Sequence, residues 1–261
     1  MLPEYIISVD LGQIHDPTAI AVLERREQLT GRQDVVQNIA AWFDGFKDQP
    51  RYYQQGQTAG HYNIVHLERL ALGTAYTDIP GRLQTIDARI RQQWVAMAVE
   101  QELAETGRAG SSLSDAPVEV VIDGTGVGRP VRDLIAEAGI EAVAITIHGG
   151  DQVIRVHERE FRVPKRDLVG AVQSAMQARR LRAAQALPDG PALKGELSNF
   201  KAKISLGGHD SYGAGDDWRE GNHDDLVLAV ALGVWFGENG ERPPFLDPAI
   251  VAAWGYLPGG A

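Results

Sequence analysis

Acidic side chains stand at three places where a metal-dependent phosphodiesterase would need them. Asp10 ends the apolar segment IISVD, Asp123 ends the apolar segment VEVVID, and the pair Asp224–Asp225 opens the apolar segment DDLVLAVALGVW. Carboxylates gathered in one place repel one another unless cations neutralise them. Carboxylate oxygens are also the ligands that Mg²⁺ and Mn²⁺ prefer. The sequence therefore predicts a divalent-metal site made by Asp10, Asp123, Asp224 and Asp225.

The four acids are not equivalent in this prediction. Adjacent residues of a helix point about 100° apart, so one member of the Asp224–Asp225 pair is expected to face the site directly. We assign the catalytic role to Asp10, Asp123 and Asp225, with Asp224 as a further metal ligand. His223 is expected to lie beside the ligands without binding the metal. Taken singly, each acid has a plainer interpretation as a turn former or a helix cap.

Two Mg²⁺ or Mn²⁺ ions, about 3.5–4 Å apart, would suit such a set of acids. Asp10 could be shared between them while they hold a scissile phosphate. One ion would activate a water and the other would stabilise the departing 3′-oxygen. No protein nucleophile is needed, which suits a chain that contains no cysteine.

Composition narrows the function classes. The chain has 261 residues, 44% of them hydrophobic, and a formal net charge of −10. Without cysteine, disulfides and thiolate zinc sites are excluded, and a reducing cytoplasm is the expected location. The N-terminus lacks the pattern of a signal peptide, and the apolar run at 226–236 is too short to span a bilayer. A protein that binds DNA along its length is usually basic. For this acidic chain, either nucleic acid is not the substrate, or the basic surface is local and a partner delivers the DNA.

Hydrophobic patterning predicts alternating strands and helices. The run from Ile79 to about Thr106 repeats apolar residues at helical spacing, with Pro80 in its first turn. A strand, a short helix and another strand then follow from 118 to 147, which implies a parallel pair. Strands are expected at 5–11, 18–25, 36–43, 63–70, 118–122 and 141–147, a hairpin or edge strand at 153–163, helices at 79–106, 129–138, 164–178, 191–203 and 224–236, and loops at 44–62 and 206–222. This order fits an α/β domain with a mixed sheet.

Several segments together resemble the nuclease domain of phage large terminase subunits. The most specific is GNHDDLVLAVALG, and VIDGTGVG, VPKRDLVGAVQ and LKGELSNF add to it. The resemblance covers most of residues 5–236. It implies a ribonuclease H-like mixed β-sheet flanked by helices on both faces, within a nuclease domain at 1–240 followed by a tail at 241–261.

The same resemblance implies metal-dependent cutting of double-stranded DNA during viral genome packaging, in the host cytoplasm if the gene belongs to a phage. Expected partners are a packaging motor ATPase, a small terminase subunit or a portal protein, and no membrane. Large terminase subunits also carry an ATPase motor, whereas this chain has no GxxxxGK[ST] phosphate loop. The chain is therefore expected to be a separated domain, a split gene product or a stand-alone relative, with any motor supplied in trans or lost.

Basic residues between 155 and 203 are candidates for contacts with the DNA backbone. Interspersed acids make a solvated helix face the plainer interpretation of any one of them. The group comprises Arg155, Arg159, Arg162, Lys165, Arg166, Lys201 and Lys203.

Two other functions remain open on the sequence. An actin- or sugar-kinase-like ATPase uses similar DxG and DGTG loops, but that class needs two such cores and the chain shows no internal repeat. A non-catalytic packaging-assembly module would have no need of the acid set.

Overall fold

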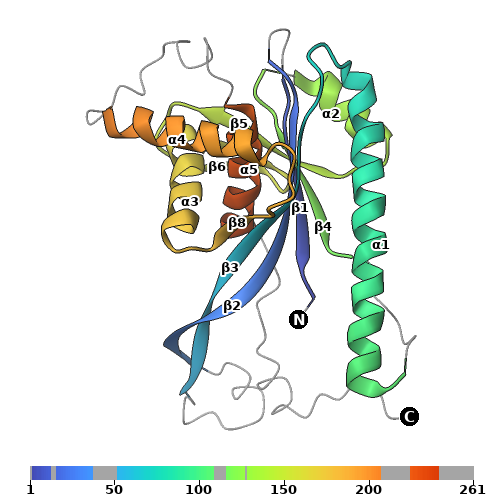
Figure 1. Ribbon diagram of the computed structural model, residues 1–261. Coiled ribbons are helices and arrows are strands. Elements are labelled where there is room, and N and C mark those ends of the chain that lie inside the picture. Colours follow the sequence, from blue (N-terminus) through green and yellow to red (C-terminus); the bar gives the residue numbers. More distant parts are fainter. Residues whose placement is uncertain are drawn as a thin grey trace. The chain divides into compact units, whose positions relative to one another are not determined.

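A mixed β-sheet organises the chain (Figure 1). The structure, a computed structural model, describes residues 2–12, 16–37, 52–108, 116–126, 128–206 and 224–240. Within these ranges eight strands form one sheet in the order β6-β7-β5-β4-β1-β2-β3-β8. The strands are β1 (Glu4–Asp10), β2 (Ala19–Gln37), β3 (Tyr52–Arg69), β4 (Val118–Asp123), β5 (Ala142–His148), β6 (Ile154–His157), β7 (Glu160–Pro164) and β8 (Leu181–Ala183).

Strand directions give the fold its class. The strand β1 pairs antiparallel with β2 and parallel with β4, and β5 extends the sheet parallel to β4. The order β3-β2-β1-β4-β5, with β2 reversed, is the ribonuclease H-like arrangement. The predicted fold class is therefore confirmed. The strand β7 adds in parallel to β5, and β6 forms an antiparallel hairpin with β7.

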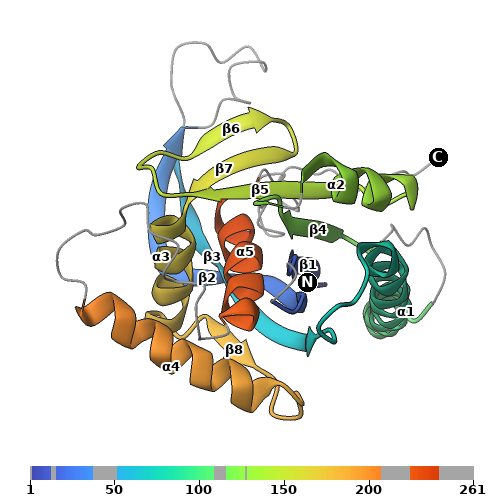
Figure 2. The same cartoon turned by 90° about the horizontal axis from the view of Figure 1, so that it is seen from above.

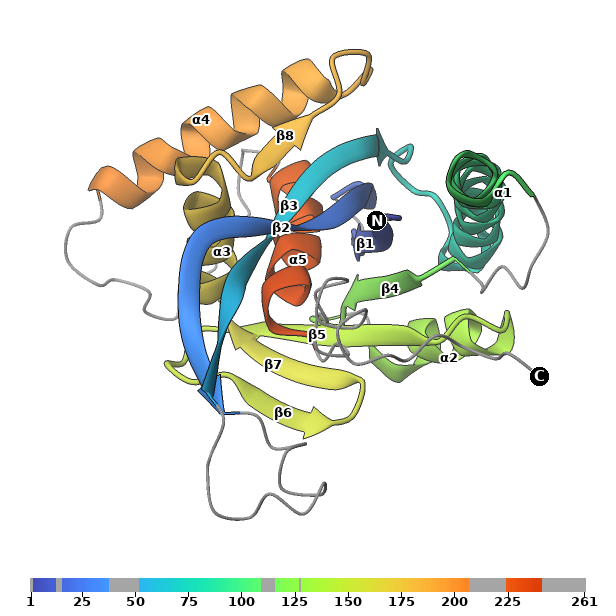
Figure 3. The same ribbon diagram turned by 90° about the horizontal axis from the view of Figure 1, so that it is seen from below.

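Helices cover both faces of the sheet (Figures 2 and 3). Among the described residues the helices are α1 (Ile79–Thr106), α2 (Gly128–Glu137), α3 (Lys165–Gln177), α4 (Gly190–Leu206) and α5 (Asp225–Asn239), with a 3₁₀ turn, η2 (Tyr76–Asp78), before α1. On one face, α1 and α2 share a core with alternate residues of β1, such as Ile7 and Val9. The other face carries α3, α4 and α5, which share a core with Ile6 and its neighbours on β2 and β4.

The central strand explains why the sequence folds this way. Its residues from Tyr5 to Asp10 are all buried, which is expected of a strand covered on both faces and explains its continuous apolar run. The helix α5 is buried along Asp225–Gly237. A helix that is apolar all round has no exposed face and belongs in the interior.

One sequence expectation is wrong in part, and one strand was not expected. The segment 44–62 was expected to be a loop, but Tyr52 onward belongs to β3. The residues from Tyr52 to Tyr62 are rich in Gln, Gly and Tyr and show no strand pattern, yet they belong to a strand that pairs with β2. Tyr62 is fully buried. The short strand β8, parallel to the end of β3, was not expected either. The predicted strand at 36–43 is described only at 36–37, within β2; its remainder and the predicted 206–222 loop beyond Leu206 lie outside the described residues.

The chain divides into two compact units. The first contains residues 1–26 and 60–238, and the second contains residues 27–59 and 239–261. The predicted boundary at 240 and the tail at 241–261 stay predictions, because residues 241–261 lie outside the described ranges. No helix of the described ranges has the length and hydropathy to cross a membrane.

Candidate active site

Asp10 and Asp123 end adjacent parallel strands. The register of β1 and β4 pairs Val9 with Ile122, so the next residue on each strand is one of the two acids. Side chains alternate along strands, and both acids therefore project from the sheet face that also carries Ser8. Both are buried, with 8% of Asp10 and 3% of Asp123 exposed. Two of the four predicted metal ligands thus stand at neighbouring positions on one face.

The turn after Asp123 is fixed by hydrogen bonds. One carboxylate oxygen of Asp123, Oδ1, accepts the Thr125 backbone N–H at 2.7 Å. The Gly124 N–H donates to the Ile145 carbonyl at 2.9 Å, and Thr125 Oγ1 accepts the Ile147 N–H at 2.7 Å. The GTG segment therefore ties the end of β4 to β5, which holds the carboxylate in one orientation.

The helix α5 runs antiparallel to β1 on the face of the two acids. Arg25 lies opposite Glu4 at the start of β1, and its Nε donates to the Gly237 carbonyl at 3.1 Å. Closer to the strand's end, a Cβ on Gly233 would lie 2.7 Å from Ser8 Oγ. Only glycine allows this approach. The C-terminal end of α5 is therefore near the start of β1, and its N-terminal end points toward the acids.

The spacing along both elements puts the start of α5 close to the level of Asp10. From Gly233 back to Asp225 is eight residues of helix, or about 12 Å. From Ser8 to Asp10 is two residues of strand, or about 7 Å. Asp225 begins the helix within roughly one turn of the level of Asp10 along the strand direction. The fold thus brings the three predicted catalytic acids to one end of the sheet.

Asp224 and Asp225 occupy the first positions of α5. The Asp224 carbonyl accepts the Leu228 N–H at 2.9 Å, so Asp224 is the N-cap and Asp225 the first helical residue. Both are buried, with 8% and 7% exposed. Negative charge at this end of a helix is favoured by the helix dipole. That position lowers the cost of burying two carboxylates side by side.

Arg69 and Glu196 also belong to this end of the sheet, and the sequence reasoning missed both. Arg69, the last residue of β3, places its Nε 3.4 Å from Asp225 Oδ2. Its Nη2 forms a hydrogen-bonded ion pair with Glu196 Oε1. The other Glu196 oxygen, Oε2, accepts the Val227 N–H at 3.1 Å. Arg69 therefore connects two carboxylates from two different helices.

A signal for Glu196 was present in the sequence. It follows Leu193 by three residues on α4, and Leu193 is 2% exposed. Residues at this spacing share a helix face, so Glu196 lies on the apolar side of α4.

Burial raises the pKa of Glu196, and the neighbouring charge of Asp225 raises it further, while the Val227 N–H and Arg69 oppose the shift.

The turn between β1 and β2 lies immediately beyond Asp10. A Cβ on Gly12 would lie 2.1 Å from the Asp16 carbonyl oxygen, so this position requires glycine. The Gly12 N–H donates to Thr18 Oγ1 at 3.1 Å, and its carbonyl accepts the Tyr76 hydroxyl at 2.7 Å. An open pocket of ≈ 240 Å³ lies here, lined in part by Thr18, Thr74 and Tyr76.

The predicted DNA-contact residues divide between the two ends of the sheet. Lys165 and Arg166 begin α3 directly after Pro164, the last residue of β7. Because β4, β5 and β7 are parallel, this is the end that carries Asp123. Arg166 Nη1 also donates to Asp151 Oδ1 at 2.6 Å. These two basic residues therefore belong to the same end of the sheet as the acids.

Arg159 lies at the opposite end. Its Nη2 donates at 2.7 Å both to Glu119 Oε2 and to the Glu141 carbonyl, near the starts of β4 and β5. Arg155 lies over an aromatic ring of β7, and Arg162 is in the middle of that strand, opposite Thr146 of β5. The members of the predicted group whose side chains are described therefore do not all lie at one end of the sheet. Its contacts with DNA stay a prediction.

Three other predicted residues are not covered. His223 lies outside the described residues, and Lys201 and Lys203 lie on α4 at positions where the side chains are not described. Their assigned roles stay predictions.

The donors at this end suit a hard divalent cation. Asp10, Asp123, Asp224 and Asp225 supply carboxylate oxygens from positions less than one-tenth exposed, and buried carboxylates need positive charge nearby. In the described part of the chain, no three His, Asp or Glu side chains are arranged as a ready-made ion cage. The acids share an end of the sheet, and their assignment as ligands rests on donor type and placement.

Comparisons with known proteins return terminase nuclease domains. No family model matches the chain, and no curated protein sequence matches it. The large terminase nuclease of thermophilic phage G20c is 17% identical, with 88% of this chain and 81% of that chain covered and a TM-score of 0.39. The human cytomegalovirus terminase nuclease domain, soaked with Mn, is 14% identical, with 91% and 85% covered and a TM-score of 0.40. Its inhibitor-bound form is 12% identical, with 90% and 84% covered and a TM-score of 0.35.

These solved structures belong to the class that the sequence motifs resemble. At such identities and TM-scores they add nothing to the fold that the strand order establishes.

Proposed function

We propose that this protein is a metal-dependent endonuclease that cuts double-stranded DNA, as the nuclease part of a viral DNA-packaging terminase. The observation that carries the proposal is the register of β1 and β4. It makes Asp10 and Asp123 neighbours on one sheet face, toward which the start of α5 points with Asp225. Two strands and a helix that are far apart in sequence thus contribute buried carboxylates to one end of the sheet.

The proposed reaction is hydrolysis of a phosphodiester. A water attacks phosphorus, the bond from phosphorus to the 3′-oxygen breaks, and a 5′-phosphate and a 3′-hydroxyl result. Asp10, Asp123 and Asp225 would hold two Mg²⁺ or Mn²⁺ ions, with Asp224 as a further ligand. Bound ions of this kind lower the pKa of the attacking water and stabilise the departing oxygen.

The chain's own residues prepare the site for this chemistry. The Thr125 N–H fixes the Asp123 carboxylate. Arg69 lies against Asp225. Lys165 and Arg166, at the same end of the sheet, are suited to contact the phosphate backbone without reading bases.

We further propose that a partner holds the DNA. The formal net charge of −10 opposes tight binding to a polyanion, since phosphate neutralisation supplies most non-specific affinity. A motor ATPase, a small terminase subunit or a portal protein would supply that grip. The isolated chain is then expected to cut slowly.

The deciding experiment is plasmid cleavage with the wild type beside Asp123→Asn, in Mn²⁺, in Mg²⁺ and in EDTA. We expect nicking and linearisation that need the metal and fall at least about 100-fold in the variant, the size of effect seen when a group that stabilises the transition state is removed. Asp87→Asn is the matched control, because Asp87 lies on α1, where it pairs with Arg91, and belongs to neither the acid set nor the predicted DNA contacts. Equal cleavage by wild type and Asp123→Asn would refute the proposal.

A further inference from the structure

The contact between Arg69 and Asp225 joins the proposed metal site to a second, buried carboxylate. Arg69 comes from β3, Asp225 from α5 and Glu196 from α4. The side chains of Glu196 and Asp225 are 9% and 10% exposed, and that of Arg69 is 25% exposed. One strand and two helices therefore meet at one guanidinium.

Arg69 contacts its two carboxylate partners, Glu196 and Asp225, with different geometry. Glu196 is held firmly, because one oxygen is in an ion pair with Arg69 and the other accepts the Val227 N–H at the start of α5. Asp225 Oδ2 is 3.4 Å from Arg69 Nε, which is within ion-pair range but long for a charge-assisted hydrogen bond. Arg69 thus forms a close ion pair with Glu196 and a longer, weaker one with Asp225.

A guanidinium cannot give up its proton in a protein. It supplies a fixed positive charge beside Asp225 whether or not an ion is bound. A divalent ion that takes Asp225 as a ligand must compete with that charge for the same carboxylate. Arg69 can release Asp225 to the ion, because the guanidinium remains paired with Glu196.

We propose that Arg69 is a positioning residue, held by Glu196, which keeps the Asp225 carboxylate in place without metal and releases it to the ion on binding. This inference rests on the proposed function, because it assumes that Asp225 is a metal ligand. It assigns a role to two residues outside the set of acids. Neither needs to touch the DNA or the ion.

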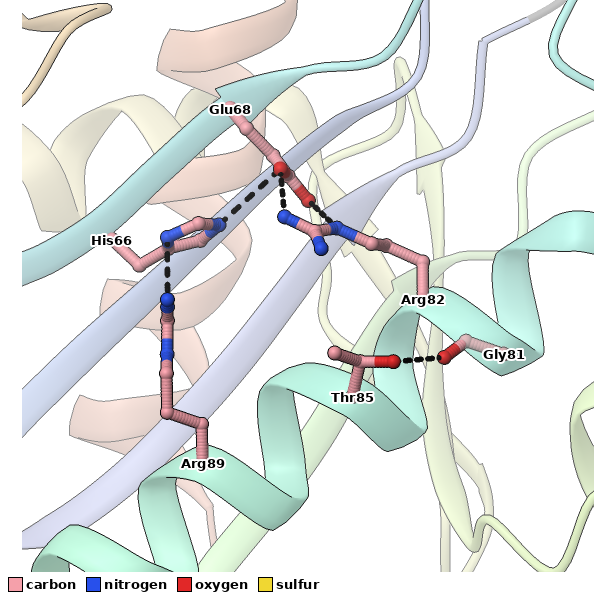
Figure 4. A network of polar contacts seen from close by, with 6 residues as sticks. All are labelled: His66, Glu68, Gly81, Arg82, Thr85 and Arg89. Carbon is pink, nitrogen blue, oxygen red and sulfur yellow. Dashed lines mark hydrogen bonds and ion pairs between the residues drawn. The ribbon is translucent and has the colours of Figure 1, made fainter.

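The ion pair between Glu68 of β3 and Arg82 of α1 is a matched control. Glu68 precedes Arg69 on β3 and therefore points to the other sheet face. Arg82 of α1 binds it through Nε at 2.7 Å and Nη2 at 2.5 Å (Figure 4). Arg82→Gln and Glu68→Gln break an arginine–glutamate pair of the same kind without touching Asp225. They report the effect of losing a charge and an ion pair in general.

The test is Mn²⁺ binding by calorimetry, with thermal unfolding of the metal-free protein and plasmid cleavage measured beside it. Arg69→Gln removes the competing charge, so we expect Mn²⁺ to bind about tenfold more tightly, the order expected when a unit charge a few ångströms from the ion is removed. Glu196→Gln frees Arg69 to pair fully with Asp225, so Mn²⁺ should bind more weakly. The two control variants should change the affinity less than about threefold, because their charges are partly exposed and screened.

The other readouts separate positioning from support of the fold. Metal-free Arg69→Gln should unfold at a lower temperature, whereas its cleavage at saturating Mn²⁺ should match that of the wild type, because Arg69 has then already released Asp225. Arg69→Lys, which keeps the charge but not the fork of donors, should bind Mn²⁺ with an affinity between those of the wild type and Arg69→Gln. Should Arg69→Gln fail to fold, Glu196→Gln should still bind Mn²⁺ more weakly than the wild type, and Arg69→Lys more tightly.

Outcomes against the proposal are distinct from failure of the proposed function. Weaker Mn²⁺ binding in both Arg69→Gln and Glu196→Gln would mean that the pair only supports the fold, and an unchanged affinity would mean that Arg69 does not compete. Either result overturns the inference even if the wild type cuts DNA. A wild type that binds Mn²⁺ without cutting would refute the nuclease, while the calorimetry would still decide the role of Arg69. A wild type that binds no Mn²⁺ overturns both.

Discussion

Glu68 on β3 accepts contacts from cationic or ionisable side chains on two sides (Figure 4). His66 Nε2 is 3.5 Å from Glu68 Oε2, Arg82 donates twice to the carboxylate, and Arg89 contacts the far nitrogen of His66. Burial by itself would raise the pKa of Glu68, but the hydrogen bonds and charges of His66 and Arg82 outweigh it and lower the pKa to about 2. This network fastens α1 to the sheet.

The lowered pKa of Glu68 predicts a pH-dependent contribution to stability. A carboxyl whose folded pKa is below its unfolded value stabilises the fold above the unfolded value and loses that effect as pH falls toward the folded one. Glu68→Gln should therefore be less stable than wild type near pH 7. The difference should shrink below about pH 4.5 and vanish near pH 2. Urea unfolding of both proteins at several pH values measures it; a difference that is constant with pH would contradict the assignment.

At the scale of elements, α5 is the part that the candidate site depends on. It lies on the sheet face that carries Asp10 and Asp123, and Gly233 lets it approach β1 and β2. A Cβ at that position would meet Leu23 Cδ1 at 2.3 Å and Ser8 Oγ at 2.7 Å. Any side chain there pushes the helix away from the sheet and moves Asp225 with it.

Gly233→Ala should therefore cost stability and activity together. Overpacking of this kind destabilises by about 1–3 kcal/mol, and displacement of Asp225 should lower cleavage about tenfold or more. The matched control is Gly170→Ala on α3, where a Cβ would meet nothing within 4 Å. That change should be neutral or slightly stabilising, since alanine is the better helix former. Thermal unfolding and plasmid cleavage of both variants test the difference. Equal melting temperatures and equal cleavage in the two variants would show that a Cβ fits at position 233.

At the scale of the whole molecule, one end of the sheet concentrates negative charge that the rest of the chain does not offset. The formal net charge is −10, and four of the buried charged residues are the aspartates at this end. Burying like charges together costs free energy that a bound cation can relieve. Metal binding should therefore be coupled to folding.

Millimolar Mn²⁺ or Mg²⁺ is expected to raise the melting temperature, because the ion binds the native state and not the unfolded chain. At 100 times Kd the stabilisation would be about 2.7 kcal/mol. The double variant Asp10→Asn, Asp225→Asn should lose most of that shift while its metal-free melting temperature stays equal or rises. Differential scanning calorimetry with and without EDTA measures this. Equal shifts in wild type and double variant would place the ions elsewhere.

The sequence by itself determined which elements form. The apolar run of β1, the helical period from Ile79, the parallel strands on either side of α2 and the apolar helix after Asp225 follow from local patterning, since each reflects burial on one or both faces. The likeness of the terminase motifs also pointed to the ribonuclease H-like class. The second part of β3 was predicted at 63–70. Its Gln- and Gly-rich start was expected to be a loop, because it has no local strand signal, and pairing with β2 decided its conformation.

The tertiary structure decided which of the candidate residues stand together. Strand register made Asp10 and Asp123 neighbours, and the contacts of Gly233 and Arg25 oriented α5 so that Asp225 lies toward them. The same structure separated Arg159 from Lys165 and Arg166, and it revealed Glu196 and Arg69, whose partners are more than 25 residues away in sequence. Local patterns record whether a residue is buried, but long-range pairing alone determines what it is buried against.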